Sequence, residues 1–198
     1  MRLMNEQGIK AAWCITDPPY GININNSIGR RKGELKSDYK KAYWDTERIG
    51  KEYFNLMFTV AEKHVIFGGN YYTDILPPSK SWVVWDKKIS DELSFSQCEL
   101  AWTDAEGMCK IVRYYPNTGT EKRTHATQKP CYVMEWIISR YTREGDLILD
   151  PFCGSFTTAV ACHKLGRHYI GFELDRDYYE LGQKRLEMAK AQMSIFDL

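Results

Sequence analysis

The fold of this chain is decided by the nine residues Asp150-Pro151-Phe152-Cys153-Gly154-Ser155-Phe156-Thr157-Thr158. Residues 146–149 before them have the pattern of a short buried strand, and residues 159–166 after them read as a helix closed by glycine. A tight turn between a strand and a helix lets backbone approach a ligand and surrounds it with helix N-terminal amides and a strand-end carboxylate. The sequence therefore predicts a ligand site at the carboxyl end of a strand.

An acidic residue follows this turn at a specific spacing in the sequence. Residues 168–172 form a second strand pattern that ends at Glu173, about 19 residues after the turn. An acid in this place can accept hydrogen bonds from two ribose hydroxyls. The spacing of turn and acid is more specific than either feature alone, and it favours a ligand that carries a ribose.

A second turn, Asp17-Pro18-Pro19-Tyr20, follows the apolar run 11–15. The two prolines fix φ and remove two backbone donors, so the chain leaves the strand in an extended turn and the Pro18 carbonyl stays out of any helix. Asp17 and this carbonyl can accept the two N–H bonds of an exocyclic amine, and Tyr20 offers a face for stacking. Taken alone, a strand followed by Asp-Pro is equally well an ordinary turn.

Three motifs of this chain resemble those of the amino-methyltransferases of nucleic acids. The Asp17 turn is similar to the family's (D/N/S)-P-P-Y signature, residues 150–158 to its F-x-G-x-G loop, and residues 125–130 to its H-P-T-Q-K-P segment. Their order is that of the family's β class, and the resemblance covers nearly the whole chain. Two positions depart from the family pattern: Phe156 stands where the loop usually ends in glycine, and Ala126 replaces a proline.

The resemblance implies a fold, an activity and a set of site residues. The fold is an α/β single-domain Rossmann-like methyltransferase, with a mostly parallel seven-stranded sheet and helices on both faces. The activity is methyl transfer from S-adenosyl-L-methionine to the N6 amine of adenine in DNA, with the base flipped out. The implied catalytic residues are Asp17, Pro18, Pro19 and Tyr20, and the implied cofactor-binding residues are Asp150, Phe152, Gly154, Ser155, Glu173, Thr127 and Lys129.

Two alternative functions stay open. One is cytosine-N4 methylation of DNA, although family members that act on cytosine more often begin the turn with serine. The other is a catalytically weak nucleic-acid-binding relative, in which the Phe156 ring crowds the methionine part of the cofactor. RNA as a substrate, a homodimer, and a link to restriction-modification, a phage or a mobile element are also left open. Glutamine methylation of proteins uses a similar turn, but those enzymes place the cofactor loop before it.

Alternating strand and helix patterns predict an open sheet with helices on both faces. Strands are expected at 13–16, 64–67, 82–85, 98–102, 111–115, 147–150 and 169–172, and helices near 50–62, 131–142, 156–165 and 176–192. Ligands collect at the carboxyl ends of the strands in such a sheet, and both motif turns lie there.

The 198 residues read as one domain with a mobile basic loop at about 21–45. Loops of this length without periodicity are commonly functional or disordered, and the basic side chains of this one suit phosphates. They are Arg30, Arg31, Lys32, Lys36, Lys40 and Lys41. A solvated charged loop is the alternative. A separate target-recognition region at about 104–125 is minimal or absent, because only about ten residues, 116–125, are available for it.

Composition limits the remaining classes. The formal net charge is only +1, so a nucleic-acid footprint must be local. No apolar stretch approaches the roughly 20 residues that span a bilayer, so no membrane partner is expected. The amino terminus lacks the apolar core of a signal peptide, and the six cysteines include no C-x-x-C pair. We therefore expect a cytoplasmic protein without a metal site.

Overall fold

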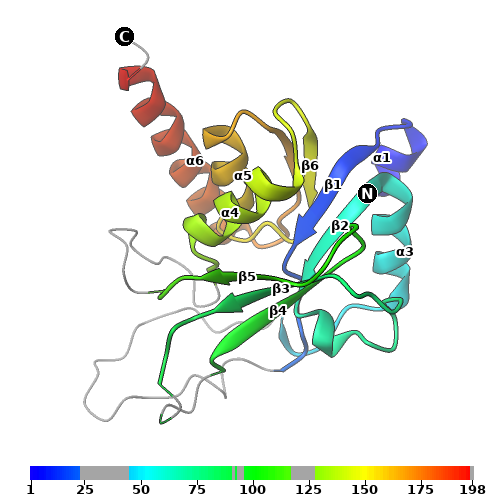
Figure 1. Ribbon diagram of the computed structural model, residues 1–198. Coiled ribbons are helices and arrows are strands. Elements are labelled where there is room, and N and C mark those ends of the chain that lie inside the picture. Colours follow the sequence, from blue (N-terminus) through cyan, green and yellow to red (C-terminus); the bar gives the residue numbers. More distant parts are fainter. Residues whose placement is uncertain (23–44, 91, 93–95, 117–127, 197–198) are drawn as a thin grey trace.

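Seven strands in one sheet form the centre of the molecule (Figure 1). The computed structural model describes residues 1–22, 45–90, 92, 96–116 and 128–196. The strands are β1 (Ala11–Thr16), β2 (Ala61–Phe67), β3 (Trp82–Asp86), β4 (Cys98–Thr103), β5 (Lys110–Arg113), β6 (Leu147–Asp150) and β7 (His168–Gly171). They lie in the order β5-β3-β4-β2-β1-β6-β7. β4 is antiparallel to both neighbours, and the other pairs are parallel, so the predicted fold class is confirmed.

Each face of the sheet has its own apolar core, because successive strand residues point to opposite sides. On β1, Ile15 packs into one core and Cys14 into the other. On β6, Ile148 and Leu149 divide in the same way. All four side chains are fully buried. Strands that are buried on both faces need helices on both faces.

Helices cover both of these cores (Figure 1). On one face lie α1 (Arg2–Glu6) and α3 (Lys51–Val60), and on the other lie α4 (Cys131–Tyr141) and α5 (Thr157–Lys164). The long α6 (Arg176–Phe196) packs on α5, and the short 3-10 helix η2 (Gly69–Tyr71) follows β2. None of the helices in the described part of the chain is both long and apolar enough to cross a membrane.

The predicted elements agree with the structure to within a few residues, and the differences have local causes. α1 is missed because five residues are too few to show a helical period. α3 passes directly into β2, where Ala61 pairs with Ala11 of β1, so the predicted helix end at 62 falls inside a strand. The predicted terminal helix stops at 192, before the observed end at Phe196.

The strand order reverses at β1, and both motif turns lie at the carboxyl ends of the strands that meet there. β2 adjoins β1 on one side, and β6 followed by β7 adjoins it on the other. Thr16 ends β1 and Asp150 ends β6, and Thr16 Oγ1 donates to Asp150 Oδ1 at 2.7 Å. Open α/β sheets bind ligands at such switch points. The expected meeting of the two turns is therefore observed.

The two predicted loop regions lie partly outside the described residues. Of the basic loop at about 21–45, the structure describes only the ends. There, Asp45 Oδ1 accepts the backbone N–H groups of Tyr20 and Gly21 at 2.9 and 3.1 Å, so the two ends lie together. Of the region at about 104–125, residues 110–113 form β5 at one edge of the sheet, and residues 117–125 are not described.

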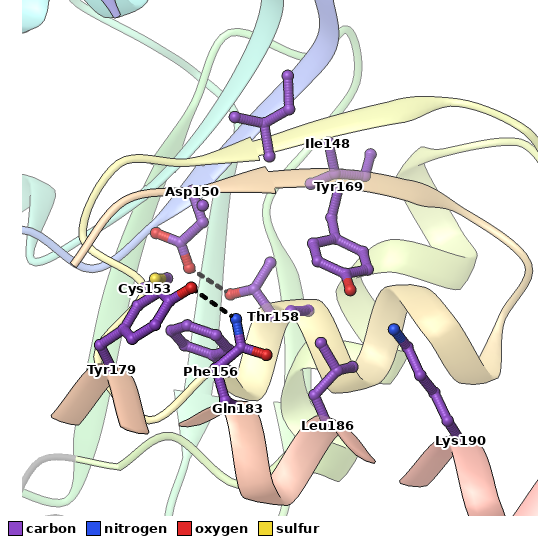
Figure 2. A pocket seen from close by; sticks show the side chains of 13 residues that line it. Ile148, Asp150, Cys153, Phe156, Thr158, Tyr169, Tyr179, Gln183, Leu186 and Lys190 are labelled. Atoms are coloured by element: carbon purple, nitrogen blue, oxygen red, sulfur yellow. Dashed lines mark hydrogen bonds between the residues drawn. The ribbon is translucent and has the colours of Figure 1, made fainter. Parts of the chain in front are cut away.

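Phe156 packs its ring against α6 (Figure 2). Its φ of 62° is in the left-handed region, and its side chain is 6% exposed. A Cβ atom on Gly182 of α6 would come within 2.4 Å of this ring. Tyr179 meets the same ring edge-on, with centroids 5.6 Å apart. The ring also lines a cavity of about 310 Å³ between β6, β7, α5 and α6. Because Gly182 has no side chain, α6 leaves the room that the Phe156 ring needs.

Gly182→Ala tests this packing, because its effect on stability should change sign with the residue at 156. In the wild-type background the added methyl group meets the ring, and we expect the free energy of unfolding to fall by about 1 to 3 kcal/mol. In the Phe156→Gly background the ring is gone, and alanine exceeds glycine in helix propensity by about 1 kcal/mol. Urea unfolding of the four proteins measures both differences. Equal destabilisation in both backgrounds would show that the ring and Gly182 are independent.

Candidate active site

The Asp17 turn begins at the carboxyl end of β1, and hydrogen bonds hold it in place. The Tyr20 hydroxyl donates to Asp17 Oδ1. The Tyr72 hydroxyl, just after η2, donates to the Pro19 carbonyl. The Pro19 carbonyl thus already has a partner within the protein, and the role of the Pro18 carbonyl as acceptor for a ligand amine stays a prediction. The turn presents its carboxylate in a fixed orientation.

A buried ammonium group lies beside Asp17. Lys129 Nζ donates to Asp17 Oδ2 at 2.5 Å and lies 3.0 Å from Glu99 Oε2, and Lys129 is 8% exposed. Burial raises the pKa of Asp17 above its usual value, and Lys129 opposes that rise. Burial lowers the pKa of Lys129, but Asp17 and Glu99 outweigh it and raise this pKa overall. Lys129 therefore stays protonated and favours the ionised form of Asp17.

Glu99 extends these contacts into a row of alternating charges. It lies near the amino end of β4, which reaches this edge of the sheet because β4 runs antiparallel to its neighbours. Glu99 Oε1 is 2.9 Å from Lys87 Nζ. Burial raises the pKa of Glu99, but Lys129 and Lys87 outweigh it and bring this pKa below its usual value. The row runs Asp17, Lys129, Glu99, Lys87.

The Tyr20 ring lies against the turn that follows β2. Tyr71 stacks on Tyr20, with centroids 4.8 Å apart and planes inclined by 16°. Gly68 has a φ of 64°, and a Cβ there would come within 2.0 Å of the Tyr20 ring, so backbone replaces a side chain at this contact. Burial, with Asp17 next in importance, raises the pKa of Tyr20 well above its usual value, so its hydroxyl stays protonated.

The glycine loop and the acid after β7 meet directly. The Gly154 N–H donates to Glu173 Oε2 at 2.8 Å, and the Asp175 N–H donates to Glu173 Oε1 at 2.8 Å. A Cβ built on Gly154 would meet no atom within 4 Å, so the space beside its Cα is open. Ser155 is buried below the loop, where Arg185 of α6 donates to its hydroxyl at 2.9 Å.

Asp150 links the end of β1 to the glycine loop and to α5, and Figure 2 shows its hydrogen bond with Thr158 of α5. Its carboxylate accepts hydrogen bonds from Thr16 Oγ1 at 2.7 Å, Thr158 Oγ1 at 2.6 Å and the Phe152 N–H at 3.2 Å. Burial raises the pKa of Asp150 to about 6, although these bonds oppose the rise. Both oxygens are thus bound inside the protein, and the direct role of Asp150 towards a cofactor stays a prediction.

The structure gathers the described site residues at one edge of the sheet. Lys129, which was expected at the cofactor, contacts Asp17 and Glu99, and its role towards a cofactor stays a prediction. Sequence reasoning misses Glu99 and Lys87. The signal that points to Glu99 is a carboxylate inside a strand whose other residues are uncharged and whose last three residues are buried. Several predicted residues lie outside the described part of the chain: Thr127, Arg30, Arg31, Lys32, Lys36, Lys40 and Lys41.

The sequence model of the DNA methylase family matches residues 69–184, which is more than half of the chain. The protein therefore belongs to the DNA methylase family.

Characterised relatives match over shorter segments. The chain is 52% identical over 63 residues to the type II methyltransferase M2.DpnII of Streptococcus pneumoniae, covering 32% of this chain and 24% of the relative. It is 35% identical over 111 residues to the type II methyltransferase M2.MboI of Moraxella bovis, covering 54% and 41%. It is 42% identical over 78 residues to the DNA adenine methyltransferase YhdJ of Escherichia coli, covering 39% and 26%. These matches span less than half the length of each relative.

Solved structures share the fold over most of the chain. The M1.HpyAVI–SAM complex superposes with a TM-score of 0.64 at 24% identity, covering 93% of each chain. The cytosine-N4-specific PvuII DNA methyltransferase superposes with a TM-score of 0.58 at 12% identity, covering 89% of this chain and 80% of that one. The Rossmann-like methyltransferase fold predicted from the sequence is confirmed.

Asp150→Asn should change how stability depends on pH. The folded protein holds the Asp150 proton up to a pKa of about 6, whereas an unfolded aspartate releases it near its ordinary value. Stability from this group is therefore full below about pH 4 and is lost as the pH rises towards 6. We expect the wild type to lose roughly 2 to 3 kcal/mol more than Asp150→Asn between pH 4 and pH 7. Urea unfolding at both pH values measures this, and identical losses would contradict the proposed burial.

Proposed function

We propose that this protein transfers a methyl group from S-adenosylmethionine to the N6 amine of adenine in DNA. The observation that carries the proposal is the meeting of the Asp17 turn with the glycine loop, which the Thr16–Asp150 hydrogen bond joins at the switch point of the sheet. Family membership and the relative named as a DNA adenine methyltransferase support DNA and adenine. The aspartate that begins the turn favours adenine over cytosine.

The residues at the glycine loop fit this cofactor. Each Glu173 oxygen accepts one backbone N–H, and a carboxylate has about four acceptor sites, so two ribose hydroxyls can still donate to it. The space beside Gly154 is open. The Phe156 ring is packed under α6, which weakens the alternative in which it crowds the cofactor. When bound, S-adenosylmethionine supplies an electrophilic methyl group on its sulfonium.

Asp17 prepares the amine for reaction. The amine nitrogen of adenine is a poor nucleophile because its lone pair is delocalised into the ring. Hydrogen bonds from its two protons to Asp17 and the Pro18 carbonyl return electron density to nitrogen as it becomes pyramidal. Lys129 and Tyr20 orient the Asp17 carboxylate in advance, and such alignment supplies much of the rate. Asp17 takes up the departing proton once transfer has begun.

The base must leave the duplex to reach Asp17, because the amine is otherwise paired inside the helix. Tyr20 offers the stacking surface, and Tyr71 already stacks on it, so these two rings form an aromatic wall beside the turn. The segment 21–45 begins directly after Tyr20, and its basic residues, from Arg30 onwards, would hold the phosphates of the strand. All six cysteines are free thiols, which suits a reducing cytoplasm.

Mass spectrometry of nucleosides tests this function. The purified chain is incubated with S-adenosylmethionine and unmethylated genomic DNA, with single-stranded RNA as a parallel substrate. N6-methyladenine in the DNA is the expected product. N4-methylcytosine would move the assignment to the cytosine branch. Calorimetric titration that shows no binding of S-adenosylmethionine would instead support a nucleic-acid-binding relative without activity.

Asp17→Ala and Glu173→Ala should separate chemistry from cofactor binding. Loss of the transition-state acceptor at Asp17 should lower kcat by about two to three decades and leave cofactor affinity within a few fold. Glu173→Ala should weaken cofactor binding by roughly 1 to 3 kcal/mol through lost ribose hydrogen bonds to a charged acceptor. Single-turnover rates and calorimetric dissociation constants measure the two effects. Near-normal turnover by Asp17→Ala, or an unchanged dissociation constant in Glu173→Ala, would remove the role of that residue.

Neutralising Arg30, Arg31 and Lys32 together should weaken DNA binding. Each phosphate contact adds about 0.9 to the slope of log affinity against log salt, so this slope should become shallower by up to about 2.7 units. Cofactor affinity should not change. A matched control removes three exposed cations of the described residues: Arg2, Lys10 and Lys184. Equal slopes for the wild type and the loop variant would mean that these charges only solvate a surface loop.

A further inference from the structure

The row of charges behind Asp17 contains two residues that no step above uses. Lys129 Nζ lies between two carboxylates, 2.5 Å from Asp17 Oδ2 and 3.0 Å from Glu99 Oε2. Glu99 is bound on its other oxygen by Lys87 Nζ at 2.9 Å. Two anions thus compete for one buried ammonium, and the second cation balances the second anion.

The backbone of the sheet fixes where each of these groups can lie. Asp17 follows β1, Lys87 follows β3, and Glu99 stands near the start of the antiparallel β4, so all three reach the same edge. Lys129 lies over the Phe67 ring at the end of β2, with Nζ 5.1 Å from the ring centroid. The side-chain exposures are 8% for Lys129, 17% for Lys87 and 24% for Glu99. Water therefore screens this row little, and its charges act on one another strongly.

Both oxygens of the Asp17 carboxylate already have donors, and this explains why a row of charges beside Asp17 is useful. In the free protein, Tyr20 donates to one Asp17 oxygen and Lys129 to the other. A target amine must share Asp17 with these donors. An ammonium paired with Asp17 alone would hold the carboxylate tightly, whereas a second anion beside it gives the ammonium another partner. Glu99 is that second anion.

We propose that Glu99 and Lys87 are positioning residues, which draw Lys129 partly away from Asp17 so that this carboxylate can accept the target amine. The inference rests on the proposed methyl transfer and deepens it. As the amine binds, Lys129 shifts its hydrogen bond towards Glu99. Lys87 balances the charge of Glu99 and holds its carboxylate in place without contacting Asp17 itself.

This arrangement has a consequence for pH dependence. The groups that act on Asp17 are Lys129, Tyr20 and Glu99, and Asp150 and Tyr72 are coupled to it electrostatically. The charge of Glu99 opposes ionisation of Asp17, and that of Lys129 favours it. Removing the charge of Glu99 should therefore lower the pKa of Asp17, even though Asp17 becomes less available to the amine.

Glu99→Gln is the test, with kcat and kcat/KM measured from pH 5 to pH 9. We expect kcat to fall roughly 10- to 100-fold, the loss typical of a reacting group displaced by about an ångström. The acid limb of kcat/KM, which reports the free enzyme, should move to lower pH by roughly half a unit or more. KM for S-adenosylmethionine should stay within a few fold. A lower kcat with an unmoved acid limb would mean a purely structural role and would overturn the proposal.

Lys87→Met gives an opposite and independent signature, and it keeps the test decisive should Glu99→Gln fail to fold. Lys129 still keeps Glu99 ionised when Lys87 is lost. The charge of Glu99 then acts on Asp17 without the balancing cation, so the acid limb should move to higher pH. Glu62→Gln, an exposed acid on β2, is the matched control and should leave both kcat and the limb unchanged. A Lys87→Met limb that stays in place, or moves to lower pH, would contradict the proposal. Absence of methylation by the wild type would instead remove the proposed function, so the two failures are distinguishable.

Discussion

The buried carboxylate of Asp150 is the group on which the geometry of the site depends. It receives hydrogen bonds from the end of β1, from the glycine loop and from the first turn of α5. Hydrogen bonds to a charged acceptor contribute about 1.5 to 3 kcal/mol each, and here they also fix direction. One side chain thus sets the position of the Asp17 turn relative to the glycine loop. The proposed methyl transfer needs both partners in line, so this bond network would serve the mechanism as well as the fold.

The charges around Asp17 illustrate a different constraint. Burial disfavours every ionised group at this edge of the sheet, and a buried charge that lost its partner would be costly. The protein places the charges in alternation, so that each has a neighbour of opposite sign. A buried row of this kind is favourable only when each charge keeps its partner. Substitution of Lys87, which does not contact Asp17, would therefore disturb the partners of Asp17 through Glu99 and Lys129.

The sequence predicts much of this fold because its signals are local. Short apolar runs mark the strands, and the motif turns at Asp17 and Gly154 carry their chemistry in consecutive residues. Glu99 and Lys87 have no such signal, because their meeting with Lys129 depends on β4 entering the sheet antiparallel between β2 and β3. The direction of the Phe156 ring is equally non-local, since it depends on Gly182 in a later helix. Pairings between distant segments are what a single sequence leaves open.

The hydrogen bonds of Asp45 have a consequence for how the segment after Tyr20 can vary between related proteins. Its carboxylate holds the Tyr20 and Gly21 amides, so the chain departs from the sheet and returns to it at one place. Lengthening a segment whose ends already meet costs little free energy, because closure entropy grows only slowly with length. The segment between Gly21 and Asp45 can therefore be replaced by another one while the sheet stays intact. The Asp17 turn would keep its position beside the replaced segment, because Asp45 holds its end.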